Sequence, residues 1–473
     1  MKLSKLFGNG PFWRTTVRIA LPVIIQNLLT SSFALIDTLM VSRLGDAALS
    51  AVGMAGQWVF VMNMCIIGLT GGMSMFASQY FGIGDYKGIR RAYGITLLSG
   101  ILLVLAFFLP AALNPRGIIG IFNKEAQILD IGSRYMQVAC WSYPATMLSL
   151  VMSSLLRSIE KVQLPMYTSA VTTVLNVVFN YGLIFGKLGM PRLGVEGAAL
   201  ATCISAWAGP VILFALSLLE KNLIATDLKG LFAFRWRNVV KYYKKTLPVL
   251  VNSGTWAIGT MIVNTVFSNM GSEYYAAVTI LRTFGDLCFA CYLGFGNAAI
   301  VMVGQDVGAG RIAEAKRSAI RCTALVMLAS LIEGVLLAVF RRQLISVFNT
   351  AGELSPVTYT TAMAIILFYG LEQPLRNIPY IHIDGVFRSG GDTVTGAIFD
   401  AVCLWLVSLP VAFLAARVWK LPFVAVFILA YLCEDILKGI LCFWHFLSWK
   451  WLRPVTEEGR RGLAEYNAKH GKK

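Results

Sequence analysis

Long apolar runs, separated by short polar segments, recur along the whole chain. Each run approaches the roughly 20 residues that a helix needs to cross a bilayer. The pattern predicts about twelve membrane-spanning helices, at residues 17–41, 51–80, 93–113, 134–156, 166–186, 197–219, 246–270, 276–303, 319–340, 360–387, 395–416 and 421–446. We therefore expect an all-α integral membrane protein.

Composition and charge sharpen this expectation. Of 473 residues, 57% are hydrophobic and 14% are charged, whereas a soluble domain has roughly 25% charged residues. The net charge is +17, and 28 of the 41 Lys and Arg residues lie on the side of the predicted helices that carries both termini, against 10 on the other side. Cytoplasmic loops are enriched in these residues. We expect a multi-pass protein of the cell membrane, embedded in the lipid bilayer with both termini cytoplasmic, and no nucleic-acid partner.

The chain also contains an internal repeat. Identical residues recur 226 positions apart, and the pairs include Pro22 and Pro248, Gly45 and Gly271, and Gln79 and Gln305. The offset becomes 231 at the pair Arg157 and Arg388. A register held over such a length indicates a duplication.

Each repeat contains six predicted spans, an even number, so both halves enter the membrane in the same direction. We expect two parallel six-helix bundles around a central cavity, arranged as a V-shaped two-lobe transporter that works by alternating access. The predicted parts are an N-lobe at 1–220, a basic cytoplasmic connector at 221–245, a C-lobe at 246–447 and a polar, disordered cytoplasmic tail at 448–473.

Asp37 is the sharpest candidate for function. It lies in the first predicted span, with no basic residue three or four positions away. Ionisable residues inside a membrane are costly and usually functional, and an unpaired carboxylate there is either protonated or matched by a cation. The alternative is that Asp37 caps or hydrogen-bonds a neighbouring helix near the outer interface, and we favour the functional interpretation.

Polar residues of two other spans suit the same site. Asn176 and Asn180 lie one helical turn apart in the fifth span, and Thr202 in the sixth can meet them from a neighbouring helix. Carboxylate, amide and hydroxyl oxygens are the ligands that a small hard cation prefers. Hydrogen bonding between helices is an equally good explanation from the residues alone.

Three acid–base pairs occur at i,i+4 spacing inside spans, namely Arg282 with Asp286, Glu372 with Arg376, and Glu434 with Lys438. Such neutralised pairs are more often structural than catalytic. We expect the first pair near the substrate path because aromatic and glycine residues surround it. The candidate cavity residues are Gln57, Trp58, Tyr143, Trp256, Arg282, Asp286, Glu372 and Arg376, although aromatic residues of this kind also pack or face lipid.

Metal and redox chemistry find little support. Cys288 and Cys291 have CxxC spacing, but no second pair or nearby histidine accompanies them. Two small buried apolar residues are the better interpretation. We expect no metal site, no disulfide and no cofactor.

The sequence resembles the multidrug and toxic compound extrusion (MATE) family. The segments that carry the resemblance are FALIDTLMVSRLGDAALSAVGMAGQ (33–57), LNVVFNYGLIFG (175–186), VGQDVGAGRIAEAKRSA (303–319) and FRSGGDT (387–393), and the likeness extends over about residues 15–447. It implies a twelve-helix secondary antiporter that exports organic cations, amphipathic drugs or metabolites in exchange for Na⁺ or H⁺. It also implies that Asp37 is the coupling site, with Asn176 and Asn180 as the polar pair of the fifth helix and Thr202 as the hydroxyl of the sixth.

Two departures from the family pattern matter. Many relatives carry an acid where Asn180 stands, so this site holds one carboxylate instead of two. Many also carry a glutamate in the seventh helix, whereas residues 251–256 here contain no acid. The missing glutamate of the seventh helix gives Asp37 more weight.

Two other functions are considered. A flippase for lipid-linked precursors belongs to the same superfamily by resemblance, but it needs a more basic cavity than Arg282 and Arg376 provide. A membrane-embedded enzyme is disfavoured because HExxH and Ser/His or Cys/His pairings are missing. We therefore expect an antiporter, acting as a monomer on small organic substrates.

Overall fold

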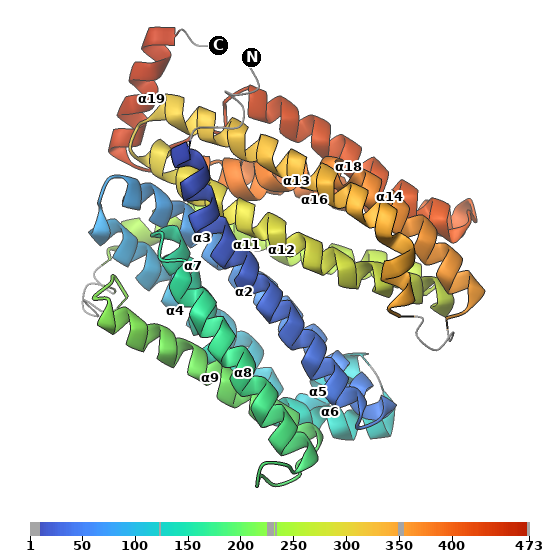
Figure 1. Ribbon diagram of the computed structural model, residues 1–473. Coiled ribbons are helices and arrows are strands. Elements are labelled where there is room, and N and C mark those ends of the chain that lie inside the picture. Colours follow the sequence, from blue (N-terminus) through green and yellow to red (C-terminus); the bar gives the residue numbers. More distant parts are fainter. Residues whose placement is uncertain (1–9, 123, 225–230, 232–233, 349–353, 471–473) are drawn as a thin grey trace. The chain divides into compact units, whose positions relative to one another are not determined.

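The computed structural model describes residues 10–122, 124–224, 231, 234–348 and 354–470, apart from the side chains of residues 11 and 46. All regular structure in this part of the chain is helical (Figure 1). The expected all-α fold is therefore confirmed. Within the predicted connector, residues 225–230 and 232–233 lie outside the described residues.

The first half of the chain contains eight α-helices and one 3-10 turn among the described residues. They are α2 (Gly10–Ser42), α3 (Asp46–Gly82), α4 (Tyr86–Leu113), α5 (Pro115–Phe122), α6 (Ala126–Ala139), η1 (Cys140–Ser142), α7 (Tyr143–Ser158), α8 (Gln163–Phe185) and α9 (Val195–Leu219).

The second half follows the same order, with π-helical segments interrupting two of its membrane helices. Its elements are α11 (Trp236–Ser268), α12 (Ser272–Gly308), α13 (Ile312–Ser346), α14 (Pro356–Tyr380), η2 (Ile381–Phe387), α15 (Arg388–Gly390), α16 (Thr393–Val402), η3 (Cys403–Ser408), α17 (Leu409–Phe413), η4 (Leu414–Val418), α18 (Phe423–Leu447) and α19 (Glu457–His470).

Helix bounds repeat with the offset found in the sequence. Helices α2 and α11 each contain 33 residues and begin 226 positions apart. Helices α3 and α12 each contain 37 residues and keep that offset at both ends. The duplication therefore extends to the lengths of these two pairs of helices.

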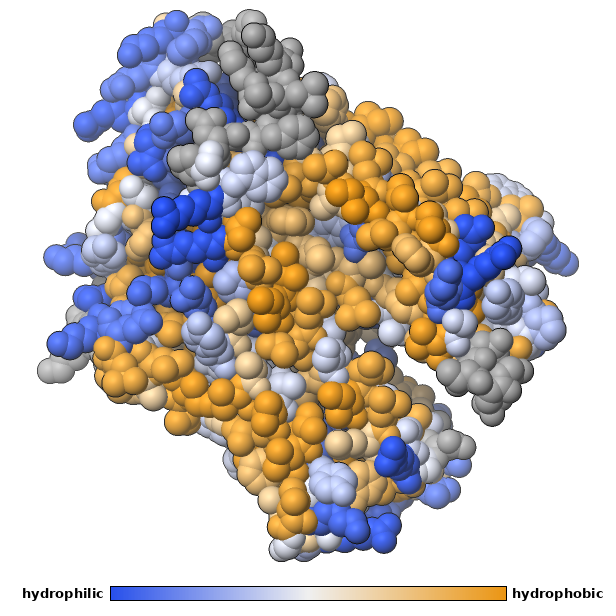
Figure 2. All heavy atoms as spheres, in the orientation of Figure 1, coloured by the Kyte–Doolittle hydropathy of each residue, from blue (hydrophilic) through white to orange (hydrophobic). Residues whose placement is uncertain are grey.

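The outer surface of the helices is apolar. Leu102 on α4 is 69% exposed, Val211 on α9 is 63% exposed and Val339 on α13 is 62% exposed, which only a lipid environment makes favourable. On the face shown in Figure 2, hydrophobic residues cover the middle of the helices and hydrophilic residues gather near their ends.

Ten helices of the described chain are long and apolar enough to cross a membrane. Helices α14 and α18 each contain 25 residues but carry charged side chains in their interior, including Glu372, Glu434 and Lys438.

The chain forms two compact units that do not coincide with its two halves. Unit 1 comprises the described parts of Met1–Leu21, Ser78–Ile83 and Val251–Lys473, and unit 2 comprises those of Pro22–Ala77 and Gly84–Leu250. The chain thus passes from unit 1 to unit 2 at Pro22, and back again two residues after Pro248. The first helix of each half begins in the unit built mainly from the other half.

Side-chain contacts explain this exchange. In unit 1, the hydroxyl of Thr16 on α2 donates to the sulfur of Met302 at 3.6 Å. In unit 2, Tyr242 at the start of α11 stacks on Phe76, with ring centroids 5.5 Å apart, and its hydroxyl lies 2.7 Å from that of Thr96. The residues of α2 before Pro22, and those of α11 before Pro248, are therefore held by side-chain contacts within these units.

Small residues allow neighbouring helices to pack closely. In unit 1, Gly334 of α13 and Gly370 of α14 face each other, and a Cβ on Gly370 would lie 2.7 Å from the carbonyl oxygen of Gly334. Backbone contact of this kind is a common way to hold membrane helices together.

The C-terminal tail is ordered, so the expectation of disorder for its described residues was wrong. Trp451 is fully buried, and residues Glu457–His470 form α19. Apolar side chains interspersed among the polar ones, such as Trp451 and Leu452, pack into unit 1.

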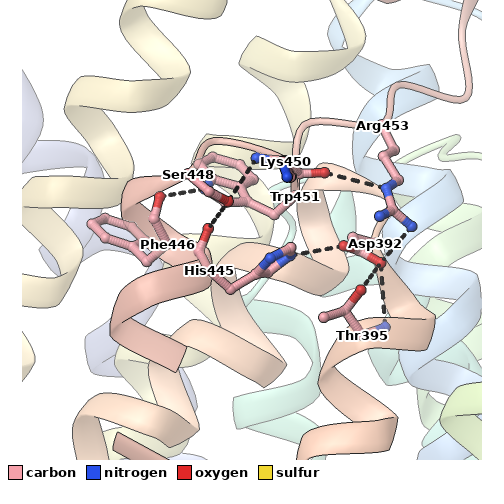
Figure 3. A network of polar contacts seen from close by, with 8 residues as sticks. All are labelled: Asp392, Thr395, His445, Phe446, Ser448, Lys450, Trp451 and Arg453. Carbon is pink, nitrogen blue, oxygen red and sulfur yellow. Dashed lines mark hydrogen bonds and ion pairs between the residues drawn. The ribbon is translucent and has the colours of Figure 1, made fainter. Parts of the chain in front are cut away.

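A polar network fixes this tail to the bundle (Figure 3). The carboxylate of Asp392, at the N-cap of α16, contacts His445 Nε2 and Arg453 Nη1, each at 2.9 Å. It also accepts a hydrogen bond from the hydroxyl of Thr395 at 3.0 Å. Burial opposes the ionisation of Asp392, but these hydrogen bonds and the charge of Arg453 hold the pKa of the carboxyl below its usual value.

Candidate functional site

A chain of hydrogen bonds in unit 2 surrounds the first candidate residue, Asp37. The amide nitrogen of Asn180 donates to Asp37 Oδ1 at 2.7 Å and also lies 2.6 Å from Asn176 Oδ1. The amide of Asn176 in turn donates to the hydroxyl of Ser205 at 3.1 Å. Three helices, α2, α8 and α9, therefore converge on one polar group.

This group, which we call the Asp37 network, is enclosed by the helices. Asn176 is 1% exposed and Asn180 is fully buried, while Asp37 is half-buried. Among the described residues Asp37 forms no ion pair, and the side-chain oxygen of Asn180 is buried without a hydrogen-bond partner. The network thus contains one uncompensated carboxylate and one unused acceptor.

Two of these helices, α2 and α8, run parallel and in register. Gln26 on α2 donates to the hydroxyl of Ser169 on α8 at 3.1 Å, and Asp37 and Asn180 meet eleven residues further along both helices. Eleven residues are about three helical turns, so both contacts lie on the same face of each helix. Figure 1 shows α2 and α8 side by side. This polar line between α2 and α8 is called the seam below.

The structure brings Asp37, Asn176 and Asn180 together, but not the hydroxyl of Thr202. Ser205, one turn later on α9, contacts Asn176 instead. Thr202 contributes only its backbone carbonyl, which accepts a hydrogen bond from Ser205 at 3.1 Å. Both hydroxyls lie on the same helix, and the sequence does not indicate which of them faces α8.

Tyr135 is a further neighbour that the sequence did not single out. It lies on α6, is 9% exposed, and interacts electrostatically with Asp37.

A second group of ionisable residues is buried in unit 1. The ammonium group of Lys438 on α18 contacts Glu434 Oε1 at 2.8 Å and Asp400 Oδ1 at 3.0 Å. The amide of Asn252 on α11 donates to Asp400 Oδ2 at 3.0 Å. The predicted pair of Glu434 and Lys438 is present, and the acid in the eleventh span, Asp400, is not isolated.

Glu372 and Arg376 do not form the ion pair that their spacing suggested. The guanidinium of Arg376 lies over the rings of Tyr369 and Tyr431, 5.4 and 5.1 Å from the centroids. Glu372, 4% exposed, lies beside the buried carboxyl of Asp435. Two carboxylates are both acceptors, so this contact is a hydrogen bond only when one of them carries a proton.

The other cavity candidates are scattered. Gln57 and the pair Arg282 and Asp286 are exposed, and the pair is not joined by an ion pair within 4.0 Å in the part of the chain that the structure describes. Trp256 is 38% exposed and Tyr143 is 1% exposed. The indole of half-buried Trp58 donates to the carbonyl of Phe107 at 3.2 Å.

The polar side chains of the Asp37 network present mainly oxygen and amide groups. No group of three or more His, Cys, Asp and Glu side chains among the described residues has metal-binding geometry. The Asp37 network offers carboxylate and amide oxygens, which suit a proton or a hard monovalent cation.

Comparisons with known proteins agree with this architecture. The family model described as MatE matches residues 22–182 and 248–414, once in each half. The chain is 25% identical to a probable multidrug resistance protein NorM of Thermotoga maritima over 446 residues, 92% of either chain. It is also 25% identical to the probable multidrug resistance protein YoeA of Bacillus subtilis, covering 88% of this chain and 89% of that protein.

Solved structures share the fold. The bent form of the Vibrio cholerae MATE transporter VcmN matches with a TM-score of 0.81 and 18% identity, over 97% of this chain and 98% of that one. An outward-facing multidrug resistance MATE family transporter matches with a TM-score of 0.80 and 18% identity, over 94% and 97% of the two chains. Because the family model covers most of both halves, this chain belongs to the MATE family of two-lobed multidrug efflux transporters and is not an enzyme.

Proposed function

We propose that this transporter is a secondary antiporter that exports organic cations and other amphipathic drugs or metabolites in exchange for Na⁺ or H⁺. It acts as a monomer in the cell membrane, with both termini in the cytoplasm. The coupling ion binds at Asp37. The observation that carries the proposal is the Asp37 network, in which a half-buried carboxylate has amide and hydroxyl neighbours but no cationic partner.

A proton on Asp37 changes the direction of its contact with Asn180. In the ionised state, the amide nitrogen of Asn180 donates to the carboxylate. A protonated carboxyl keeps one acceptor oxygen and gains an O–H donor, and the Asn180 oxygen accepts that hydrogen once the amide turns. That oxygen is the atom left without a partner in the present arrangement. Protonation therefore repacks the contact between α2 and α8.

A sodium ion acts on the same atoms. The carboxylate of Asp37 and the side-chain oxygens of Asn176 and Asn180 are ligands of the kind that a hard cation takes. A bound ion draws the Asn180 oxygen toward Asp37 and requires the same rotation of the amide. Either ion thus opposes the hydrogen bond that joins the two helices when the site is empty.

Helix α2 can transmit this change. Pro22 lies inside it and leaves a backbone carbonyl one turn earlier without its helical donor. The proline also marks the point where the chain passes from unit 1 to unit 2. Repacking around Asp37 is therefore expected to bend α2 at Pro22 and to weaken the substrate site while the carrier faces outward.

The test is efflux of a fluorescent organic cation from proteoliposomes, with sodium and proton gradients imposed separately. Asp37→Asn should abolish gradient-driven efflux while substrate binding is retained. Asp130→Asn is the matched control, because Asp130 is exposed and paired with Arg134 at 3.2 Å. The gradient that drives efflux identifies the coupling ion.

Other outcomes redirect the proposal. Normal efflux by Asp37→Asn would reject Asp37 as the coupling site and favour the carboxyl pair of Glu372 and Asp435, which Glu372→Gln then tests. If the wild-type protein moved no organic cation under either gradient, the antiporter proposal would be replaced by a lipid-linked precursor flippase.

A further inference from the structure

A half-buried arginine at the far end of the seam has no acidic partner among the described residues. Arg157 lies in the last turn of α7, and its Nη1 donates to the side-chain oxygen of Gln26 at 3.3 Å. Its Nε is buried without a hydrogen-bond partner, and Arg157 forms no ion pair with any described residue. The hydrogen bond that the structure gives the guanidinium is therefore to a neutral amide and not to an acid.

The equivalent residue in the other half is neutralised. Arg388 lies 231 positions after Arg157 and forms an ion pair with Asp384, one helical turn earlier. The position equivalent to Asp384 in the first half is Ser153, one turn before Arg157. The arginine has been kept in both halves, whereas its acid is present in only one.

A second acid is missing in the same place. Asn252 donates to Asp400 in unit 1, and the equivalent contact in unit 2 is the donation of Gln26 to Ser169. Serine therefore replaces both Asp384 and Asp400, and these two acids interact electrostatically in unit 1. The shared amide contact confirms that the residues being compared are structurally equivalent.

A buried guanidinium without a counter-charge is unfavourable, because the desolvation of the ion is not offset. An oxyanion that accepts hydrogen bonds from the N–H groups of the arginine supplies the missing counter-charge. Arg binds carboxylates and phosphates in this way, with paired hydrogen bonds. We propose that Arg157, together with Gln26 and Ser169, forms a binding site for a carboxylate or phosphate group that takes the place of the two absent acids. The site is independent of the coupling role proposed for Asp37.

Thermal unfolding of the purified full-length protein in a neutral detergent tests this site. One arm uses phosphate as a soluble oxyanion and compares sodium phosphate with sodium chloride at equal ionic strength. The other arm uses an anionic lipid headgroup and compares dioleoyl phosphatidylglycerol with the zwitterionic dioleoyl phosphatidylcholine. At saturation the anion should raise the Tm of the wild-type protein by about 3 °C.

Two variants remove the site in opposite ways. Arg157→Gln deletes the cation, and Ser153→Asp supplies the internal acid that the other half carries. Each should abolish the rise in Tm, and each should leave the anion-free protein at least as stable as the wild type, because a buried charge is deleted or neutralised. Arg134→Gln, which alters an exposed and already paired arginine, should leave the response unchanged.

The outcomes are distinct. A response to phosphatidylglycerol alone identifies a lipid headgroup, a response to phosphate alone identifies a soluble oxyanion, and either one supports the site. The proposal is overturned if the wild-type protein responds to neither, if Arg157→Gln or Ser153→Asp keeps the response, or if Arg134→Gln loses it.

Discussion

The first and fifth membrane helices of each half meet through one amide side chain, and what surrounds that amide differs between the halves. In unit 2, Gln26 is linked to a serine and an arginine, and the Asp37 network follows three turns later. In unit 1, Asn252 is linked to Asp400, which is paired with Lys438. The two halves thus share the hydrogen bond from the amide but differ in the charged residues around it.

The Asp37 network itself has no counterpart in the second half. The equivalent positions of Asp37, Asn176 and Asn180 are valines at 263, 407 and 411. The second half instead concentrates its acids on α14, α16 and α18, where two basic residues lie among them. After the duplication, different residues at a few positions therefore produced one site with a single carboxylate and one site with several acids and two basic residues.

The largest expected effect comes from breaking the charged site of unit 1. Lys438→Met leaves Glu434 and Asp400 buried without their cation and should lower the free energy of unfolding by about 3–5 kcal/mol. Thermal unfolding in detergent measures it. Lys161→Met is the control, because Lys161 and its partner Glu220 are 50% and 37% exposed, and its loss should be under about 1 kcal/mol. If the two variants lost equal free energy of unfolding, the ion pairs of Lys438 would be no more important for stability than an exposed pair.

Removing the anchor of the C-terminal tail should have the next largest effect. Asp392→Asn deletes two charged contacts and is expected to lower stability by about 2–3 kcal/mol at neutral pH. Because the folded-state pKa of Asp392 lies below its usual value, the wild-type advantage should be constant above about pH 5 and fall only as the carboxylate is protonated, below about pH 4. Thermal unfolding of both proteins across this range is the measurement. An advantage that shrinks between pH 8 and pH 6 would contradict this assignment.

Transplanting a residue between the halves sharpens the comparison. Asn180→Val, which copies the equivalent Val411, leaves Asp37 without its donor and should lower stability by about 1–2 kcal/mol and uncouple efflux from the ion gradient. The reciprocal Val411→Asn should leave coupling intact, because no carboxylate stands at the equivalent of Asp37. Proteoliposome efflux under a gradient distinguishes the two variants. Coupling that survives Asn180→Val would remove the network from the mechanism.

The smallest effect is expected at the contact that both halves share. Ser169→Ala removes a neutral acceptor and should lower stability by about 0.5–1 kcal/mol. Asp400→Ala removes a charged acceptor and leaves Lys438 with Glu434 as its remaining acidic partner, so its loss of stability should be larger than that of Ser169→Ala. Comparison of the two Tm values tests whether charge, and not the hydrogen bond itself, separates the halves.

Much of the fold was predictable because apolar run length and the repeat are properties of the sequence itself. The helix bounds agree with the offset of 226, and the approach of Asn176 and Asn180 to one another follows from their spacing. The choice of Ser205 over Thr202 was not predictable, since it depends on how α9 is rotated against α8. The ordered tail was missed because a few tryptophans anchor an otherwise polar segment.

Charge pairing was the weakest part of the prediction. Spacing of i,i+4 permits an ion pair, but Arg376 lies against tyrosine rings instead. Arg157 was assigned to a cytoplasmic loop, whereas it belongs to α7. Both errors arise because tertiary neighbours, and not the local sequence, decide where a long basic side chain goes.

The crossing of the chain at Pro22 and next to Pro248 has a consequence for biosynthesis. Residues 10–21 belong to unit 1, most of which is translated after residue 250. These residues therefore have to wait, without their final neighbours, until nearly all later helices have been inserted. Unit 2 likewise needs the beginning of α11 before it is complete. Neither half of the gene encodes a self-sufficient folding module, and two separately expressed halves would have to exchange helix ends to assemble.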